Sequence, residues 1–135
     1  MKKALLYMAY TVAYGFWWFV SLLPFSVLYA LSDMLYLLMS RVIRYRHRVI
    51  WHNLTTSFPE KTEAELRKIE RKFYHWFCDY IVETVKLMTI SKQQIMKRMT
   101  FTGTEKIEQL LAEGRSIGVY LGHLGNWEWI TSLPY

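Results

Sequence analysis

The sequence has little cysteine, proline and glycine, and each shortage excludes a class of protein. Its 135 residues include a single cysteine, Cys78, which excludes an internal disulfide framework and a zinc site built from paired cysteines. Three prolines and six glycines exclude collagen-like and low-complexity chains. Apolar residues make up 53% of the chain and aromatic residues 17%, which excludes an intrinsically disordered protein. The length is sufficient for one domain with a buried core.

Charge is missing from one part of the chain. No charged residue lies between Lys3 and Asp33, whereas the other acidic residues and all basic residues except Lys2 and Lys3 lie beyond residue 40. The formal net charge is +6. This asymmetry predicts a membrane-anchoring helical segment over residues 1–45, followed by a more polar part over residues 46–135.

The apolar run is too long for one simple membrane-spanning helix. As a single helix, residues 4–32 would extend about 43 Å, whereas the hydrocarbon core of a bilayer is about 30 Å thick. Pro24 is a natural break, because proline removes a backbone donor and clashes with the preceding turn. We therefore expect helices over 4–22 and 25–40. A cleaved signal peptide is the alternative, but its apolar region is only about 7–15 residues long.

Basic residues flank both ends of the apolar run. They are Lys2, Lys3, Arg41, Arg44, Arg46 and Arg48. Because positive charge tends to stay cytoplasmic, a re-entrant hairpin or an interfacial helix pair fits better than one crossing, although a single span stays open. The arginine cluster suits anionic lipid headgroups. Nucleic acid is the alternative partner of such a patch, and the neighbouring apolar anchor argues against it.

Two further helices are predicted before residue 90. Residues 47–57 form a short helix that ends at Phe58 and Pro59. Thr62 and Glu65 then form a capping box at the start of a long helix. Apolar residues recur along it at steps of three and four, which predicts its buried face. That predicted face consists of Leu66, Ile69, Phe73, Trp76, Phe77, Tyr80, Thr84, Val85 and Met88.

The periodicity changes after residue 100. A short helix over 104–113 is expected to end at Gly114. The apolar run 116–121 is typical of a short buried strand. A loop over 122–125 leads into a helix that starts at Trp127. Helix, strand, loop and helix in this order predict an α/β sheet, in which reactive groups gather beyond the carboxyl ends of the strands.

His123 and Glu128 are the candidate catalytic residues. On one straight helix their spacing corresponds to about 140° of rotation, so they would not share a face. With His123 in the loop and Glu128 in the first turn of the next helix, the carboxylate can approach the ring. It would then hold one imidazole nitrogen protonated and leave the other free to accept a proton from a hydroxyl. The spacing alone equally fits a histidine with a structural role.

The block from Phe101 to Glu128 resembles the bacterial lipid A biosynthesis acyltransferases, the lauroyl and myristoyl transferases. Its most specific part is Gly-His-Leu-Gly-Asn-Trp-Glu, over residues 122–128, directly after the predicted strand. The family belongs to the glycerolipid acyltransferase group, which is marked by histidine followed five positions later by aspartate or glutamate. The resemblance extends upstream through the arginine-rich stretch that leads into His52 to the apolar N-terminus, and it covers essentially the whole chain.

The resemblance implies a fold as well as an activity. N-terminal apolar membrane-anchor helices would precede amphipathic helices that lead into the first strands of an acyltransferase α/β sheet. Residues 46–135 would be the N-terminal part of the acyltransferase domain. Because members of the family are longer than this chain, the sheet and the enzyme are expected to be incomplete.

The activity implied by the resemblance is transfer of a fatty acyl chain from acyl carrier protein to a hydroxyl of a lipid A precursor. His123 would be the general base and Glu128 would orient it, with no metal or organic cofactor. The expected partners are membrane lipid, the lipid A precursor and the acidic acyl carrier protein, without nucleic acid. The expected location is the cytoplasmic side of the bacterial inner membrane. A lysophospholipid or aminolipid acyltransferase and a non-enzymatic membrane-interface module are the alternatives.

Overall fold

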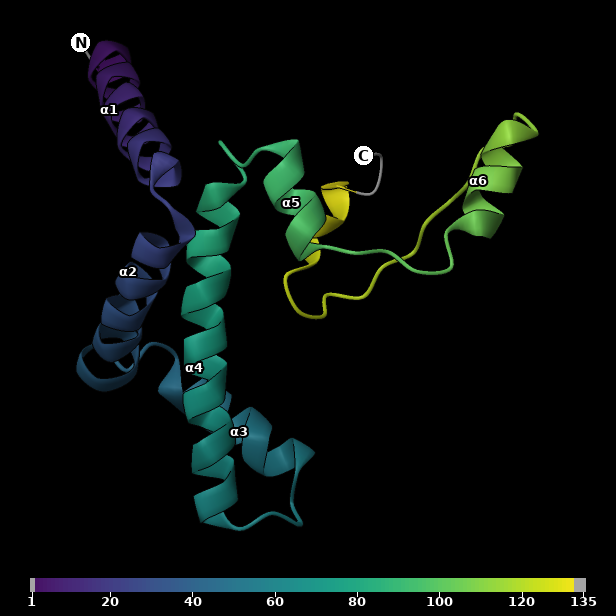
Figure 1. Cartoon of the computed structure of the whole chain (residues 1–135). Helices are drawn as coiled ribbons and strands as arrows, with labels where there is room; N and C mark the ends of the chain where they lie inside the picture. Colours follow the sequence, from purple (N-terminus) through teal and green to yellow (C-terminus); the bar gives the residue numbers. More distant parts are fainter. Residues whose placement is uncertain (1, 133–135) are drawn as a thin grey trace. The chain divides into compact units, whose positions relative to one another are not determined.

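The computed structural model describes residues 2–132, and helices dominate it (Figure 1). Contacts between residues divide the chain after Met88 into two compact units. The expected functional division, with an anchor over 1–45 and an acyltransferase part over 46–135, stays a prediction.

The first unit confirms the helices predicted before residue 90. Helix α1 ends before Pro24, which is the N-cap of α2 with an extended backbone (φ −65°, ψ 154°). Thr62 and Glu65 form the predicted capping box at the start of α4. The elements are α1 (Lys2–Leu22), α2 (Phe25–Leu37), the π-helical turn η1 (Leu38–Val42), α3 (His47–Ser57) and α4 (Glu63–Lys86).

Helix α4 buries a different face from the predicted one. Of the predicted set only Leu66 is buried, and Trp76 is 42% exposed. The buried residues recur at every fourth position and include two charged side chains. They are Leu66, Glu70, Tyr74, Cys78, Val82 and Lys86. The apolar pattern predicted the wrong face because two buried residues of α4 are charged. Their burial is possible only because they have polar partners within the first unit, and a pattern of apolar residues does not reveal such partners.

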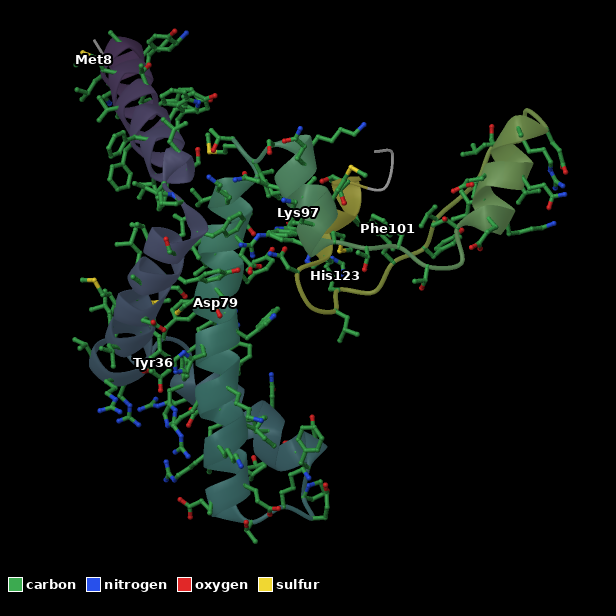
Figure 2. All side chains as sticks on the ribbon, viewed as in Figure 1. Met8, Tyr36, Asp79, Lys97, Phe101 and His123 are labelled. Carbon is green, nitrogen blue, oxygen red and sulfur yellow. The ribbon has the colours of Figure 1, made fainter. Side chains whose placement is uncertain are left out.

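Helix α2 presents hydroxyl groups to carboxylates of α4. The Ser32 hydroxyl donates a hydrogen bond to Asp79 Oδ1 at 2.6 Å, and the Tyr29 hydroxyl donates one to Glu83 Oε1 at 2.8 Å. Figure 2 shows Asp79 on α4 beside α2. These bonds satisfy polar groups at a helix pair whose core cluster consists of Tyr36, Tyr74 and Cys78. They therefore fix the register of α2 against α4.

Lys86 joins the end of α4 to the turn between α1 and α2. Its ammonium group donates hydrogen bonds to the carbonyl oxygens of Ser21 at 2.8 Å and Leu23 at 2.9 Å, and it lies 5.6 Å from the centroid of the Phe25 ring. The last carbonyls of a helix have no partner within the helix, so a cation there satisfies them and opposes the negative end of the helix dipole. Lys86 is only 5% exposed, and this burial lowers its pKa.

We expect Cys78 to resist alkylation in the folded chain. Its side chain is fully buried, and burial followed by the nearby Asp79 carboxylate raises the pKa of its thiol, which disfavours the reactive thiolate. Maleimide labelling followed by mass spectrometry should detect an unlabelled chain until denaturant is added. As a control, a Lys68→Cys variant adds one exposed thiol on α4 and should gain a single label. Rapid labelling of Cys78 in the folded chain would contradict the α2–α4 packing.

The second unit contains three short helices. These are α5 (Lys92–Arg98), α6 (Glu105–Ala112) and the 3-10 helix η2 (Trp127–Ser132). The predicted helix over 104–113 is confirmed as α6, and Gly114 ends it in the left-handed conformation with φ +73°. Helix α5 escaped prediction, although Ser91 and Gln94 form a capping box that marks its start. Helices α5 and η2 pack against each other.

The predicted α/β sheet is wrong, because residues 2–132 contain no strand. The run 116–121, expected to be a buried strand, is extended chain without a ladder partner. Val119 is 52% exposed and Tyr120 is 99% exposed. A strand satisfies its backbone N–H and C=O groups only by pairing with a neighbour. Apolar composition suits this run for a strand, but the described part of the chain supplies no second strand to pair with it.

Candidate active site

The structure places His123 on the exposed loop that precedes η2 (Figure 2). Its imidazole meets the Trp127 ring edge to face, with 4.6 Å between the ring centroids. The backbone bends at this point, since the Leu124 N–H donates to the Gly122 carbonyl and Gly125 has a φ of +62°. Glycine adopts this left-handed conformation without the penalty that a side chain would impose. The loop thus exposes the His123 imidazole, and the Trp127 ring packs against it.

Glu128 lies in the first turn of η2, as expected, and its side chain is half-buried. The predicted helix start at Trp127 is confirmed, although the element is a 3-10 helix. Within residues 2–132, no hydrogen bond or ion pair joins His123 to Glu128. The structure therefore places the two residues on one loop-and-turn segment, and their predicted hydrogen bond stays a prediction. An exposed imidazole in such a position can accept a proton from an incoming hydroxyl.

An apolar cavity of about 720 Å³ lies in the second unit. Its volume is in the range of small-molecule sites, and its walls come from α5, α6 and the extended run that was expected to be a strand. The sequence gives no sign of this cavity, because its lining residues come from four segments with no common spacing. The lining includes Met96, Met99, Phe101, Ile107, Leu111 and Ile117. The cavity is suited in size and polarity to a hydrocarbon chain.

The described part of the chain has no group of three or more His, Cys, Asp or Glu side chains arranged to hold a metal ion. His47 instead contacts the buried Glu70 carboxylate, and His75 stacks on Tyr36 with 3.6 Å between the ring centroids. That the chemistry needs no metal or organic cofactor stays a prediction from the sequence.

Comparison with known proteins gives one family. The family model described as bacterial lipid A biosynthesis acyltransferase matches residues 1–132. The lipid A biosynthesis lauroyltransferase of Escherichia coli (strain K12) is 30% identical over 103 residues, which are 76% of this chain and 34% of that protein. The chain thus spans about a third of the length of this curated relative. No solved structure matches the chain. On the strength of the family match, the chain belongs to the bacterial lipid A biosynthesis acyltransferase family.

Proposed function

We propose that the chain carries the catalytic histidine of an enzyme that moves a fatty acyl group from acyl carrier protein to a hydroxyl of a lipid A precursor. The observation that carries the proposal is the exposed His123 on a bent loop, followed by Glu128 in the next helical turn, within a chain of this family. The relative in Escherichia coli is named a lauroyltransferase.

The proposed step is a base-assisted acyl transfer. The free nitrogen of His123 accepts the proton of the acceptor hydroxyl while the hydroxyl oxygen attacks the thioester carbonyl carbon. An ester C–O bond forms, the C–S bond breaks, and the carrier thiolate leaves and receives the proton from the imidazolium. Glu128 would accept a hydrogen bond from the second imidazole nitrogen and so hold the ring in the required tautomer. The apolar cavity of the second unit is the candidate site for the acyl chain.

The N-terminal helices support a membrane location for this activity. The segments Lys2–Leu22 and Phe25–Val42 are long and apolar enough to cross a membrane, and only 6% of the first is buried within the protein. An enzyme anchored in the membrane by these helices could reach an acceptor lipid that lies in the same membrane. We place the catalytic part on the cytoplasmic side of the inner membrane, where basic segments tend to remain and where the acidic carrier protein would be steered by the net charge of +6.

The test is an acyl-transfer assay of a hybrid, in which this chain replaces the matching segment of the Escherichia coli relative. Lauroyl-loaded carrier protein is supplied with a lipid A precursor, a lysophospholipid or an aminolipid. We expect ester formation on the lipid A precursor at least about tenfold faster than on the other two, a difference of about 1.4 kcal/mol. Preference for another acceptor would select the lysophospholipid or aminolipid alternative. A folded, membrane-bound hybrid without transfer would favour the non-enzymatic module.

A further inference from the structure

The loop between η1 and α3 holds two arginines in an unusual backbone conformation. Arg44 has a φ of 53° and Arg46 a φ of 50°, which is the left-handed region that side chains disfavour. Such a conformation is strained for a residue with a side chain, so it persists only where the surroundings impose it. Residues with such strained backbone conformations are enriched at active sites and ligand-binding sites.

Tyr45 imposes this conformation, because it is fixed from three directions. Its N–H donates to the Met39 carbonyl, its carbonyl accepts a 2.8 Å hydrogen bond from the Tyr74 hydroxyl, and its ring stacks on Phe77 at 5.8 Å. Tyr74 is itself buried in the core of the first unit. The tyrosine therefore anchors the loop to α4, and the arginine on each side of it is held at the surface.

The arginines in this loop and at its two ends form no ion pair in the part of the chain that the structure describes. They are Arg41, Arg44, Arg46 and Arg48, and all four are exposed. The buried carboxylate of Glu70 is engaged by His47. Figure 2 shows nitrogen-tipped side chains gathered at the end of α2, near Tyr36.

Three of these four arginines line a hollow in the surface. A cavity of about 450 Å³ is lined by Arg44, Arg46, His47, Arg48 and Val49. The loop directly follows the apolar segment Phe25–Val42. It therefore lies at the boundary between an apolar segment and a basic one. In a bilayer this is the level of the headgroups.

We propose that the cavity lined by Arg44, Arg46 and Arg48 binds the phosphate group of one anionic phospholipid headgroup. A guanidinium presents a planar fork of N–H donors that pairs with two phosphate oxygens at once, and three forks around one hollow match one phosphate. Charge complementarity and the position beside the apolar segment select a lipid as the source of this phosphate. The site is discrete, in contrast to general attraction of a basic surface to a membrane, and it is separate from the proposed acyl transfer.

The test counts lipids retained by the full chain. The chain is purified in neutral detergent micelles doped with phosphatidylglycerol or with phosphatidylcholine, and native mass spectrometry measures how many lipids stay bound. We expect one phosphatidylglycerol per chain, bound more tightly than phosphatidylcholine. The Arg44→Gln/Arg46→Gln variant should weaken this binding about thirtyfold, at about fivefold per basic residue.

Three control variants distinguish a discrete phosphate site from general charge attraction and from loss of structure. Arg71→Gln/Lys72→Gln removes the same charge from the exposed surface of α4 and should change binding less than about twofold. Arg44→Gly/Arg46→Gly keeps the left-handed backbone available, so it should lose the lipid while its helical circular dichroism is retained. Arg44→Lys/Arg46→Lys keeps the charge without the fork and should bind at an intermediate level.

Several outcomes would overturn the proposal. One is an equal effect of the loop variant and the α4 variant, because that indicates general electrostatics. Equal retention of the two lipids is another. Displacement of the lipid by inorganic phosphate at similar concentration would assign the cavity to free phosphate. Retention of a DNA duplex with the same dependence on Arg44 and Arg46 would assign it to nucleic acid.

Discussion

Replacing His123 with alanine in the hybrid enzyme lowers the rate of acyl transfer by about 10² to 10⁴, the usual contribution of a positioned general base. The imidazole lies on an exposed loop and makes a T-shaped contact with the Trp127 ring, so its loss should leave the helices unchanged. The rate is measured with lauroyl-loaded carrier protein and a lipid A precursor. Recovery of the variant in the membrane fraction, at the level of the parent, confirms that the loss is chemical.

His52→Ala is the matched control, because His52 is also an exposed histidine but lies on α3 in the first unit. It should transfer acyl groups at the parental rate. Glu128→Gln keeps the shape of the side chain but removes its charge, so it should reduce the rate less than His123→Ala. Near-parental turnover of His123→Ala would remove His123 from the mechanism.

Replacing Lys86 with methionine lowers the free energy of unfolding by about 2–3 kcal/mol, because the Ser21 and Leu23 carbonyls lose their charged donor at a buried position. Unfolding is followed by circular dichroism in detergent micelles as denaturant is added. Lys72→Met makes the same substitution on an exposed part of α4 and should change the free energy by less than about 0.5 kcal/mol. Equal stability of the two variants would show that Lys86 does not hold the α1–α2 turn.

The same lysine predicts a pH dependence of stability. Burial lowers the pKa of Lys86 below its ordinary value of 10.5, so just under pH 10.5 the unfolded chain holds more protons at this residue than the folded chain. Unfolding free energy therefore rises with pH through that window, and the burial penalty is fully present below the folded pKa. Lys86→Met should remove this rise, which a denaturant titration at several pH values would detect. A rise that persists in the variant would assign the effect to another group.

Local signals in the sequence predicted much of the first unit. Pro24 and the Thr62–Glu65 capping box act through neighbouring residues, so the end of α1 and the starts of α2 and α4 could be located from sequence. The buried face of α4 could not be predicted, because the burial of Glu70 depends on His47 and the burial of Lys86 depends on the carbonyls at the α1–α2 turn. Those partners are distant in sequence, and no periodicity reports them.

In the candidate site, too, local features could be predicted from the sequence and features that depend on distant residues could not. The positions of His123 and Glu128 on a loop and the following turn could be predicted, since Gly122 and Gly125 mark the bend locally. The strand expected before them was wrong, because apolar composition alone does not make a strand. A strand needs a second strand to pair with, and residues 2–132 contain none. The cavity in the second unit likewise depends on segments brought together only by folding.

The pairing of α2 with α4 limits how deeply the chain can enter a bilayer. Helix α4 packs along α2 but also carries exposed charged side chains, among them Lys68, Arg71 and Lys72. A charged surface of this kind cannot face hydrocarbon cheaply. With such a companion, we expect α2 to take a shallow position at one leaflet, and we expect α1, which is exposed along most of its length, to be the helix that enters deeper.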